Sequence, residues 1–186
     1  MHAAVHALAA LGFLRISHGV GMFVARPRSH AAILDHAWQN ATPMELALMR
    51  AAIDERMPVV VAMQVDSQPA VRLPRTLSDI SFLAHERSVC RSGYADVFIQ
   101  ADLAFHRTVA ASVRGTEVTV GLHQHIGRRM LPALLPVADV LASDEDLDAA
   151  HLQLVGAILA GEPMTTARLA RFIARRELGS LGRALG

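Results

Sequence analysis

Two side chains that can coordinate a metal lie four positions apart in the stretch ADLAFH, residues 101–106. Asp102 and His106 fall on one face of a predicted helix, because positions i and i+4 are neighbours on a helical surface. The same stripe carries Phe98 and Val109, so this face should point into a protein core. A carboxylate buried there is costly unless it is paired or bound to a cation.

A third candidate ligand, His151, belongs to the inward stripe of a later predicted helix, with Leu147 and Leu154. Three ligands from two helices can converge on one ion, and the interiors of helical bundles hold such sites. The alternative is a hydrogen-bonded ion pair between Asp102 and His106, with His151 as an ordinary core residue. Spacing alone leaves both interpretations open.

Two further histidines, His123 and His125, lie two positions apart in a predicted helix. They point to different faces, so only one of them can reach an inward site. We take His125 as the additional candidate.

The elements that must position these side chains are predicted to be helices. Hydrophobic residues make up 52% of the 186 residues and aromatic residues only 4%, which favours closely packed helices with a small-aliphatic core. Thr42 and Glu45 form a predicted capping box at the first helix, and Ser143 is the predicted N-cap of a later one. Prolines within 65–79 predict a loop, and Pro132 predicts a helix break. We predict an all-α bundle of about six helices.

Residues 1–29 have a different sequence pattern from the predicted helices that follow. FLRIS and MFVA flank the glycine-containing turn HGVG, which predicts a β-hairpin after a helix that ends near Gly12. A lone two-stranded hairpin is at best marginally stable in water. The hairpin therefore either packs on the rest of the chain or belongs to a larger domain.

Composition sets few limits on function. The net charge is +1, which argues neither for nor against binding of nucleic acid. Cys90 is the one cysteine of the sequence and cannot form an internal disulfide, as expected for a reducing compartment. We find no secretory signal and no apolar segment long enough to cross a membrane. We therefore expect a cytoplasmic protein without a membrane partner.

Four stretches, taken in order, resemble the FadR-like branch of the GntR transcription regulators, namely ALAALGFLRISHGVGMFVARP, LMRAAID, DLAFHRTVA and HLQLVGAILAG. Members of that branch pair a winged helix-turn-helix with an all-helical ligand-binding domain called FCD. The resemblance implies a partial winged helix-turn-helix at 1–29, a linker at 30–41 and an effector-binding domain at 42–186. It also implies a homodimer that binds operator DNA and a small organic acid effector, without enzymatic activity.

The resemblance further implies a divalent metal held by one aspartate and three histidines. Asp102, His106 and His151 match three of these ligands, and the residue types suit Zn²⁺ or Ni²⁺. The fourth position falls on Ile173, which cannot coordinate a metal. Either water or His125 then fills the gap, or the centre is metal-free, as in the family's fatty-acyl-responsive members.

Arg50 matches an arginine near the family's effector pocket, where a guanidinium can form a bidentate pair with a carboxylate. Its alternative role is a salt bridge with Asp54 at i+4. The predicted hairpin matches the family's wing, which approaches the minor groove of DNA, through Arg15, His18, Gly19 and Gly21. Most of the family's recognition helix and the helix before it have no counterpart in this sequence. We therefore expect the chain by itself to bind DNA poorly.

Two other classes of function stay open from the sequence. The chain can be a stand-alone ligand-binding or dimerisation module that binds no DNA. A metal-dependent hydrolase would also use carboxylate and imidazole around an open metal position. Against the hydrolase, the sequence shows no second carboxylate or nucleophile placed to act as a base beside the predicted site.

Overall fold

The computed structural model describes residues 14–17, 21–24, 37–67, 74–89, 95–113 and 115–185. Its internal contacts divide the chain into two units, Met1–Ala41 and Thr42–Gly186. Each unit is described by itself below.

The first unit contains the predicted hairpin. Strands β1 (Leu14–Ser17) and β2 (Gly21–Val24) pair antiparallel, with Leu14 opposite Val24 and Ser17 opposite Gly21. Gly21 has a φ of 138°, a conformation that glycine adopts without a steric cost. The expected helix end near Gly12 and most of the expected linker lie outside the described residues, as do His18 and Gly19.

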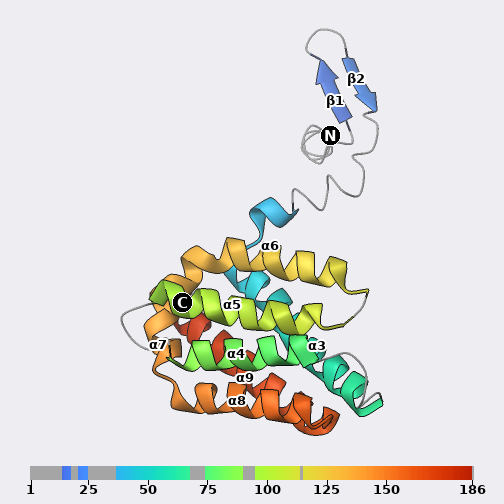
Figure 1. Ribbon diagram of the computed structural model, residues 1–186. Coiled ribbons are helices and arrows are strands. Elements are labelled where there is room, and N and C mark those ends of the chain that lie inside the picture. Colours follow the sequence, from blue (N-terminus) through green and yellow to red (C-terminus); the bar gives the residue numbers. More distant parts are fainter. Residues whose placement is uncertain are drawn as a thin grey trace. The chain divides into compact units, whose positions relative to one another are not determined.

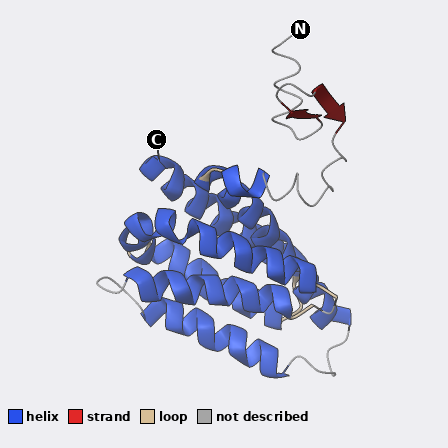
Figure 2. Ribbon diagram, turned by 90° about the horizontal axis from the view of Figure 1, so that it is seen from above, coloured by secondary structure: helices blue, strands red, loops and turns tan. Residues whose placement is uncertain are grey.

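The second unit is an all-α bundle, as predicted from composition and periodicity (Figure 1). Figure 2 shows that helices make up this unit, with loops and turns between them. The helices are α3 (Pro43–Ser67), α4 (Pro74–Val89), α5 (Ala95–Ala111), α6 (Glu117–Leu134), α7 (Ala138–Ala142), α8 (Glu145–Leu159) and α9 (Pro163–Leu185), with a 3₁₀ turn, η1 (Leu135–Val137), after α6.

The C-terminal helix α9 packs along α3 and also contacts α8. Helix α4 lies against α5 and α8, and α6 lies against α3 and α5. The interior between these helices is filled mainly by small and medium aliphatic side chains, including Val61, Ala62, Ile80, Leu147 and Leu154. Helices α3, α5, α8 and α9 therefore face one common core. None of the described helices is long and apolar enough to span a membrane.

Local capping explains where two of the helices begin. At α3, the Thr42 amide donates to Glu45 Oε2 at 2.8 Å, and the Glu45 amide donates to Thr42 Oγ1 at 3.2 Å. This reciprocal pair is the predicted capping box. At α8 the N-cap is Asp144, whose Oδ1 accepts from the Leu147 amide at 3.1 Å. The prediction of Ser143 as the cap was wrong by one residue, because the Ser143 hydroxyl instead donates to the Val140 carbonyl.

Two prolines sit inside helical segments where the sequence predicted interruptions. Helix α4 begins at Pro74, in the predicted loop, because proline has no amide hydrogen to lose in a first helical turn. Helix α6 continues through Pro132 to Leu134 before η1 and α7 follow. The break predicted at Pro132 was therefore wrong in position.

Candidate metal centre

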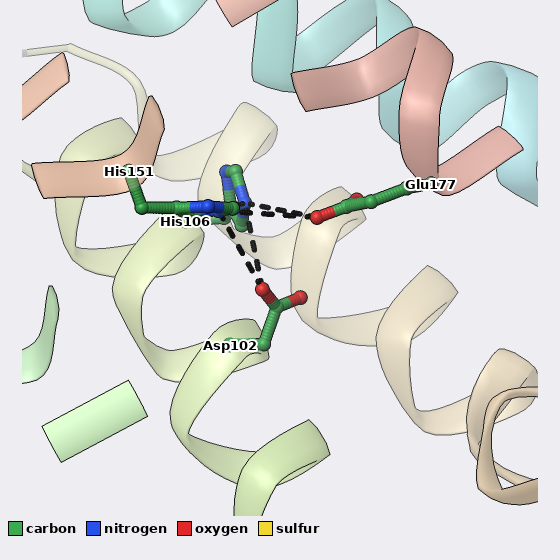
Figure 3. Close-up of side chains that lie close together, drawn as sticks. All are labelled: Asp102, His106, His151 and Glu177. Atoms are coloured by element: carbon green, nitrogen blue, oxygen red, sulfur yellow. Dashed lines mark hydrogen bonds and ion pairs between the residues drawn. The ribbon is translucent and has the colours of Figure 1, made fainter. Parts of the chain in front are cut away.

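Four potential metal ligands converge in the core from three helices (Figure 3). Helix α5 supplies Asp102 and His106, α8 supplies His151, and α9 supplies Glu177. One donor atom from each residue lies within 4.8 Å of all the others. Asp102, His106 and His151 are buried, and Glu177 is partly buried. The convergence of Asp102, His106 and His151 was expected from their helical stripes.

The two imidazole nitrogens lie close to each other and to both carboxylates. His106 Nε2 and His151 Nε2 are 3.4 Å apart, and Asp102 Oδ1 lies 4.0 and 3.7 Å from them, respectively. Glu177 Oε1 lies 3.9 Å from each of the two imidazole nitrogens. Tetrahedral ligands about 2.1 Å from a zinc ion are about 3.4 Å apart. The five pairs that include an imidazole nitrogen are thus within about 0.6 Å of the tetrahedral spacing, and the two carboxylate oxygens lie within 4.8 Å of each other.

The hydrogen bond of His151 fixes which of its ring nitrogens can coordinate. His151 Nδ1 lies 2.8 Å from the carbonyl oxygen of Leu147, one turn earlier in α8. A carbonyl only accepts, so Nδ1 carries the hydrogen and Nε2 of the neutral ring presents a lone pair to the cluster. Such an outer hydrogen bond is the usual way in which proteins orient a metal-binding histidine.

In its neutral form, His106 cannot satisfy both of its ring nitrogens with protein groups alone. Its Nδ1 is buried without a hydrogen bond and lies 3.5 Å from Asp54 Oδ1. A hydrogen on Nε2 can reach His151, but then the bare Nδ1 faces the Asp54 carboxylate. A hydrogen on Nδ1 can face Asp54, but then two Nε2 lone pairs face each other at 3.4 Å. A cation between the Nε2 atoms removes this conflict.

The protonation states of the cluster suit metal binding. Burial lowers the pKa of His106 to about 4 and that of His151 well below its usual value. Both imidazoles are therefore neutral near pH 7, which is the form that coordinates metals. Burial, reinforced by the charge of Asp102, raises the pKa of Glu177 to about 8. Glu177 Oε1 also lacks a hydrogen-bond partner, and a cation beside it would favour the ionised carboxylate.

Two buried arginines hold the acidic side of the centre. Arg50 Nη2 donates to Asp102 Oδ2 at 2.6 Å and Arg50 Nε to Asp54 Oδ2 at 2.9 Å. Arg87 Nε donates to Asp102 Oδ1 at 2.8 Å. Burial by itself would raise the pKa of Asp102, but Arg50 and Arg87 hold it well below its usual range. The Arg50–Asp54 ion pair considered from the sequence is thus present, together with a second pair to Asp102.

The formal charge of the buried carboxylates and guanidiniums is what one divalent cation would neutralise. Arg87 also pairs with Asp148, and Glu177 Oε2 lies 3.5 Å from Arg50. Four carboxylates, those of Asp54, Asp102, Asp148 and Glu177, thus surround two guanidiniums. With neutral imidazoles and all four carboxylates ionised, the formal charge is two negative units. A divalent cation would balance it.

The space beside the cluster is small. A cavity of about 20 Å³ is bordered by Arg50, Asp54, Asp102 and Glu177. A single water molecule needs about 10–15 Å³ measured in this way. The cavity thus has room for an ion or one water molecule, and not for an organic acid.

Glu177 was not predicted from the sequence, because the resemblance implies a ligand at position 173. Ile173, the expected fourth position, is 1% exposed and belongs to the apolar core. Glu177 lies one helical turn later on the same face of α9. A search for any carboxylate or imidazole at i+4 from Ile173 would have found it.

The other predicted residues fall in several places. His123 is buried, and its Nε2 lies 3.1 Å from Asp54 Oδ1. His125 is exposed on α6, so the structure brings His123 toward the core in place of His125. Arg15 lies in β1 and Gly21 begins β2.

Comparison with solved structures shows a likeness of fold. No protein-family model matches the chain, and no curated protein matches its sequence. A solved structure described as a GntR of Streptococcus agalactiae superposes with a TM-score of 0.59 at 17% sequence identity. The superposition covers 96% of this chain and 80% of that chain. The chain has a GntR-like fold.

Proposed function

We propose that this chain is the sensing part of a GntR-type transcription regulator, and that its bundle holds a divalent metal. The proposed ligands are Asp102, His106, His151 and Glu177. The observation that carries the proposal is the pair of imidazole Nε2 atoms 3.4 Å apart, for which no placement of the His106 hydrogen satisfies both of its ring nitrogens. When bound, the metal supplies a positive charge that joins α5, α8 and α9.

The regulatory role follows from where the ligands come from. Because three helices contribute donors, the bound and free states should differ in how α5, α8 and α9 pack. A ligand that favours one arrangement shifts the population of the whole domain. In a homodimer that binds operator DNA, such a shift changes the affinity for DNA. The GntR-like fold supports this part by analogy, with zinc or nickel as the metal and a small organic acid as the effector.

A hydrolase is less well supported than a sensor. Glu177 does supply the second carboxylate that the sequence did not reveal. However, the cavity of about 20 Å³ beside the cluster leaves no space for a substrate. A stand-alone sensing or dimerisation module without DNA binding remains the second candidate, because the bundle carries the whole proposed centre.

Metal binding is tested by thermal unfolding of chelator-treated protein with and without added Zn²⁺, Ni²⁺ or Mn²⁺. A ligand that binds only the folded state raises the unfolding temperature, and at about 100 times Kd it contributes about 2.7 kcal/mol. We expect the rise in wild type and its loss in His151→Ala. His125→Ala, which removes an exposed histidine, is the matched control and should respond like wild type. No rise with any of the three metals would refute the proposal.

The regulatory part needs a separate measurement. Fluorescence anisotropy on DNA from upstream of the coding sequence, at low salt, should show binding when residues 30–186 follow a GntR-type winged helix-turn-helix. Affinity should fall steeply with salt and change when metal is removed. Absence of binding at low salt would leave the stand-alone module as the better account.

A further inference from the structure

A second polar cavity lies between α5 and α6, on the side of α5 that faces away from the metal centre's donors. It has a volume of about 250 Å³. Its walls carry Gln100 and Arg107 from α5 and Gln124 and Arg128 from α6, and His123 also lines it. We call this cavity the α5–α6 groove. Measured in the same way as the cavity beside Arg50, the groove is more than ten times larger.

The two arginines of the groove are available to an anion. Arg107 and Arg128 are exposed and come from opposite walls. Neither forms an ion pair or a hydrogen bond within the described part of the chain. Arg50, by contrast, is buried and already contacts three carboxylates. A guanidinium pairs best with a carboxylate through two parallel hydrogen bonds, and two such groups on opposite walls suit a molecule with two carboxylates.

The groove is linked to the metal centre through His123. This side chain is 1% exposed, and its Nε2 lies 3.1 Å from Asp54 Oδ1. The same oxygen lies 3.5 Å from Nδ1 of His106, a proposed metal ligand. The chain makes a second link, because Leu103 and Arg107 of the groove directly follow Asp102 and His106 in α5. A molecule that moves the outer side of α5 therefore also moves two metal ligands.

We infer that the α5–α6 groove binds a small dicarboxylate, whose carboxylates pair with Arg107 and Arg128. Its occupancy is transmitted to the metal centre through His123 and Asp54. This inference deepens the proposed sensing function and rests on it, because the anion acts on the regulator only by way of that centre. The small cavity beside Arg50 could not hold such a molecule.

The test is calorimetric titration of the whole chain with succinate and with adipate, a shorter and a longer dicarboxylate. Succinamide, which has the shape of succinate without its charges, is the control ligand. Arg107→Gln and Arg128→Gln remove one charge each, and Arg168→Gln removes an exposed arginine from α9 as the matched control. We expect at least one acid to bind wild type and Arg168→Gln. Each groove variant should weaken it about tenfold or more, as a lost charge-assisted hydrogen bond does.

The titration is run on metal-loaded and on chelator-treated protein, so that the two proposals can fail separately. Binding that persists after chelation and depends on Arg107 and Arg128 supports the groove even if no metal binds. Binding that disappears with chelator and is unchanged in Arg107→Gln and Arg128→Gln places the acid on the metal and overturns the inference. Absence of binding by both acids, equal binding of succinamide, or equal weakening in Arg168→Gln also overturns it.

Discussion

At the scale of single residues, the proposed metal ligands differ at one position from the aspartate and three histidines that the family resemblance implies. Glu177 supplies a carboxylate where the resemblance implies a third histidine, so the donor set has two oxygens and two nitrogens. A carboxylate adds negative charge to a buried region and needs either a proton or a cation to offset it. The state of Glu177 should therefore report directly on whether the centre is filled.

The raised pKa of Glu177 makes the metal-free protein less stable as pH rises. In the unfolded chain this carboxyl has its ordinary pKa of 4.5, whereas in the fold its pKa is about 8. The unfolded state thus binds fewer protons between these values, and the free energy of unfolding falls over that window. Glu177→Gln removes the titration, so the chelated variant should lose less stability than wild type from pH 5 to pH 9. Parallel curves of unfolding temperature against pH would contradict this.

Ile173 lies on the same face of α9 as Glu177, but a change there should alter stability without altering metal binding. Because it is a core residue, Ile173→Val should lower the free energy of unfolding by about 0.5–1.5 kcal/mol. Metal stoichiometry should stay as in wild type, since position 173 supplies no donor atom. Urea unfolding and metal analysis of the same preparation measure both quantities. A changed stoichiometry would show that the centre extends to position 173.

At the scale of elements, the α8–α9 connection depends on one glycine. Gly161 has a φ of 64°, and a Cβ there would lie 3.0 Å from the Asp66 backbone nitrogen in α3. Gly161→Ala should therefore cost about 1–2 kcal/mol from its backbone conformation, before any clash. Gly156→Ala is the matched control in α8, where a Cβ meets nothing within 4 Å. That variant should gain about 0.5–1 kcal/mol. Urea unfolding that ranks the two variants the other way would contradict this account of the turn.

Some helix boundaries could be predicted from the sequence, and others could not. The Thr42–Glu45 capping box was predictable because its hydrogen bonds join residues three apart. The start of α4 at Pro74 was not predicted, although proline suits a first helical turn for a local reason. The passage of α6 through Pro132 was not predicted either, because a proline inside a helix removes one backbone hydrogen bond and usually marks a break.

At the scale of the whole molecule, some residues of the proposed centre could be predicted from local sequence spacing, and others depend on contacts between helices that are distant in the sequence. Asp102 and His106 were found from a four-residue spacing, and His151 from the apolar stripe of its own helix. Glu177 faces inward because α9 packs between α3 and α8, and its own neighbours in sequence are arginines and a leucine. The choice between His123 and His125 likewise depended on how α6 rotates against α3 and α5.

A bound metal would join three helices that are separated in the sequence. This predicts that chelation lowers the stability of the bundle as one cooperative unit, since α5, α8 and α9 each lose a shared contact.

The most direct test is the metal stoichiometry of the chelator-treated, then reloaded chain, measured by elemental analysis after dialysis. We expect one equivalent of a divalent transition metal per chain in wild type, and less than about one tenth of that in a variant with both His106→Ala and His151→Ala. No retained metal in wild type, or equal retention in the double variant, would contradict the account.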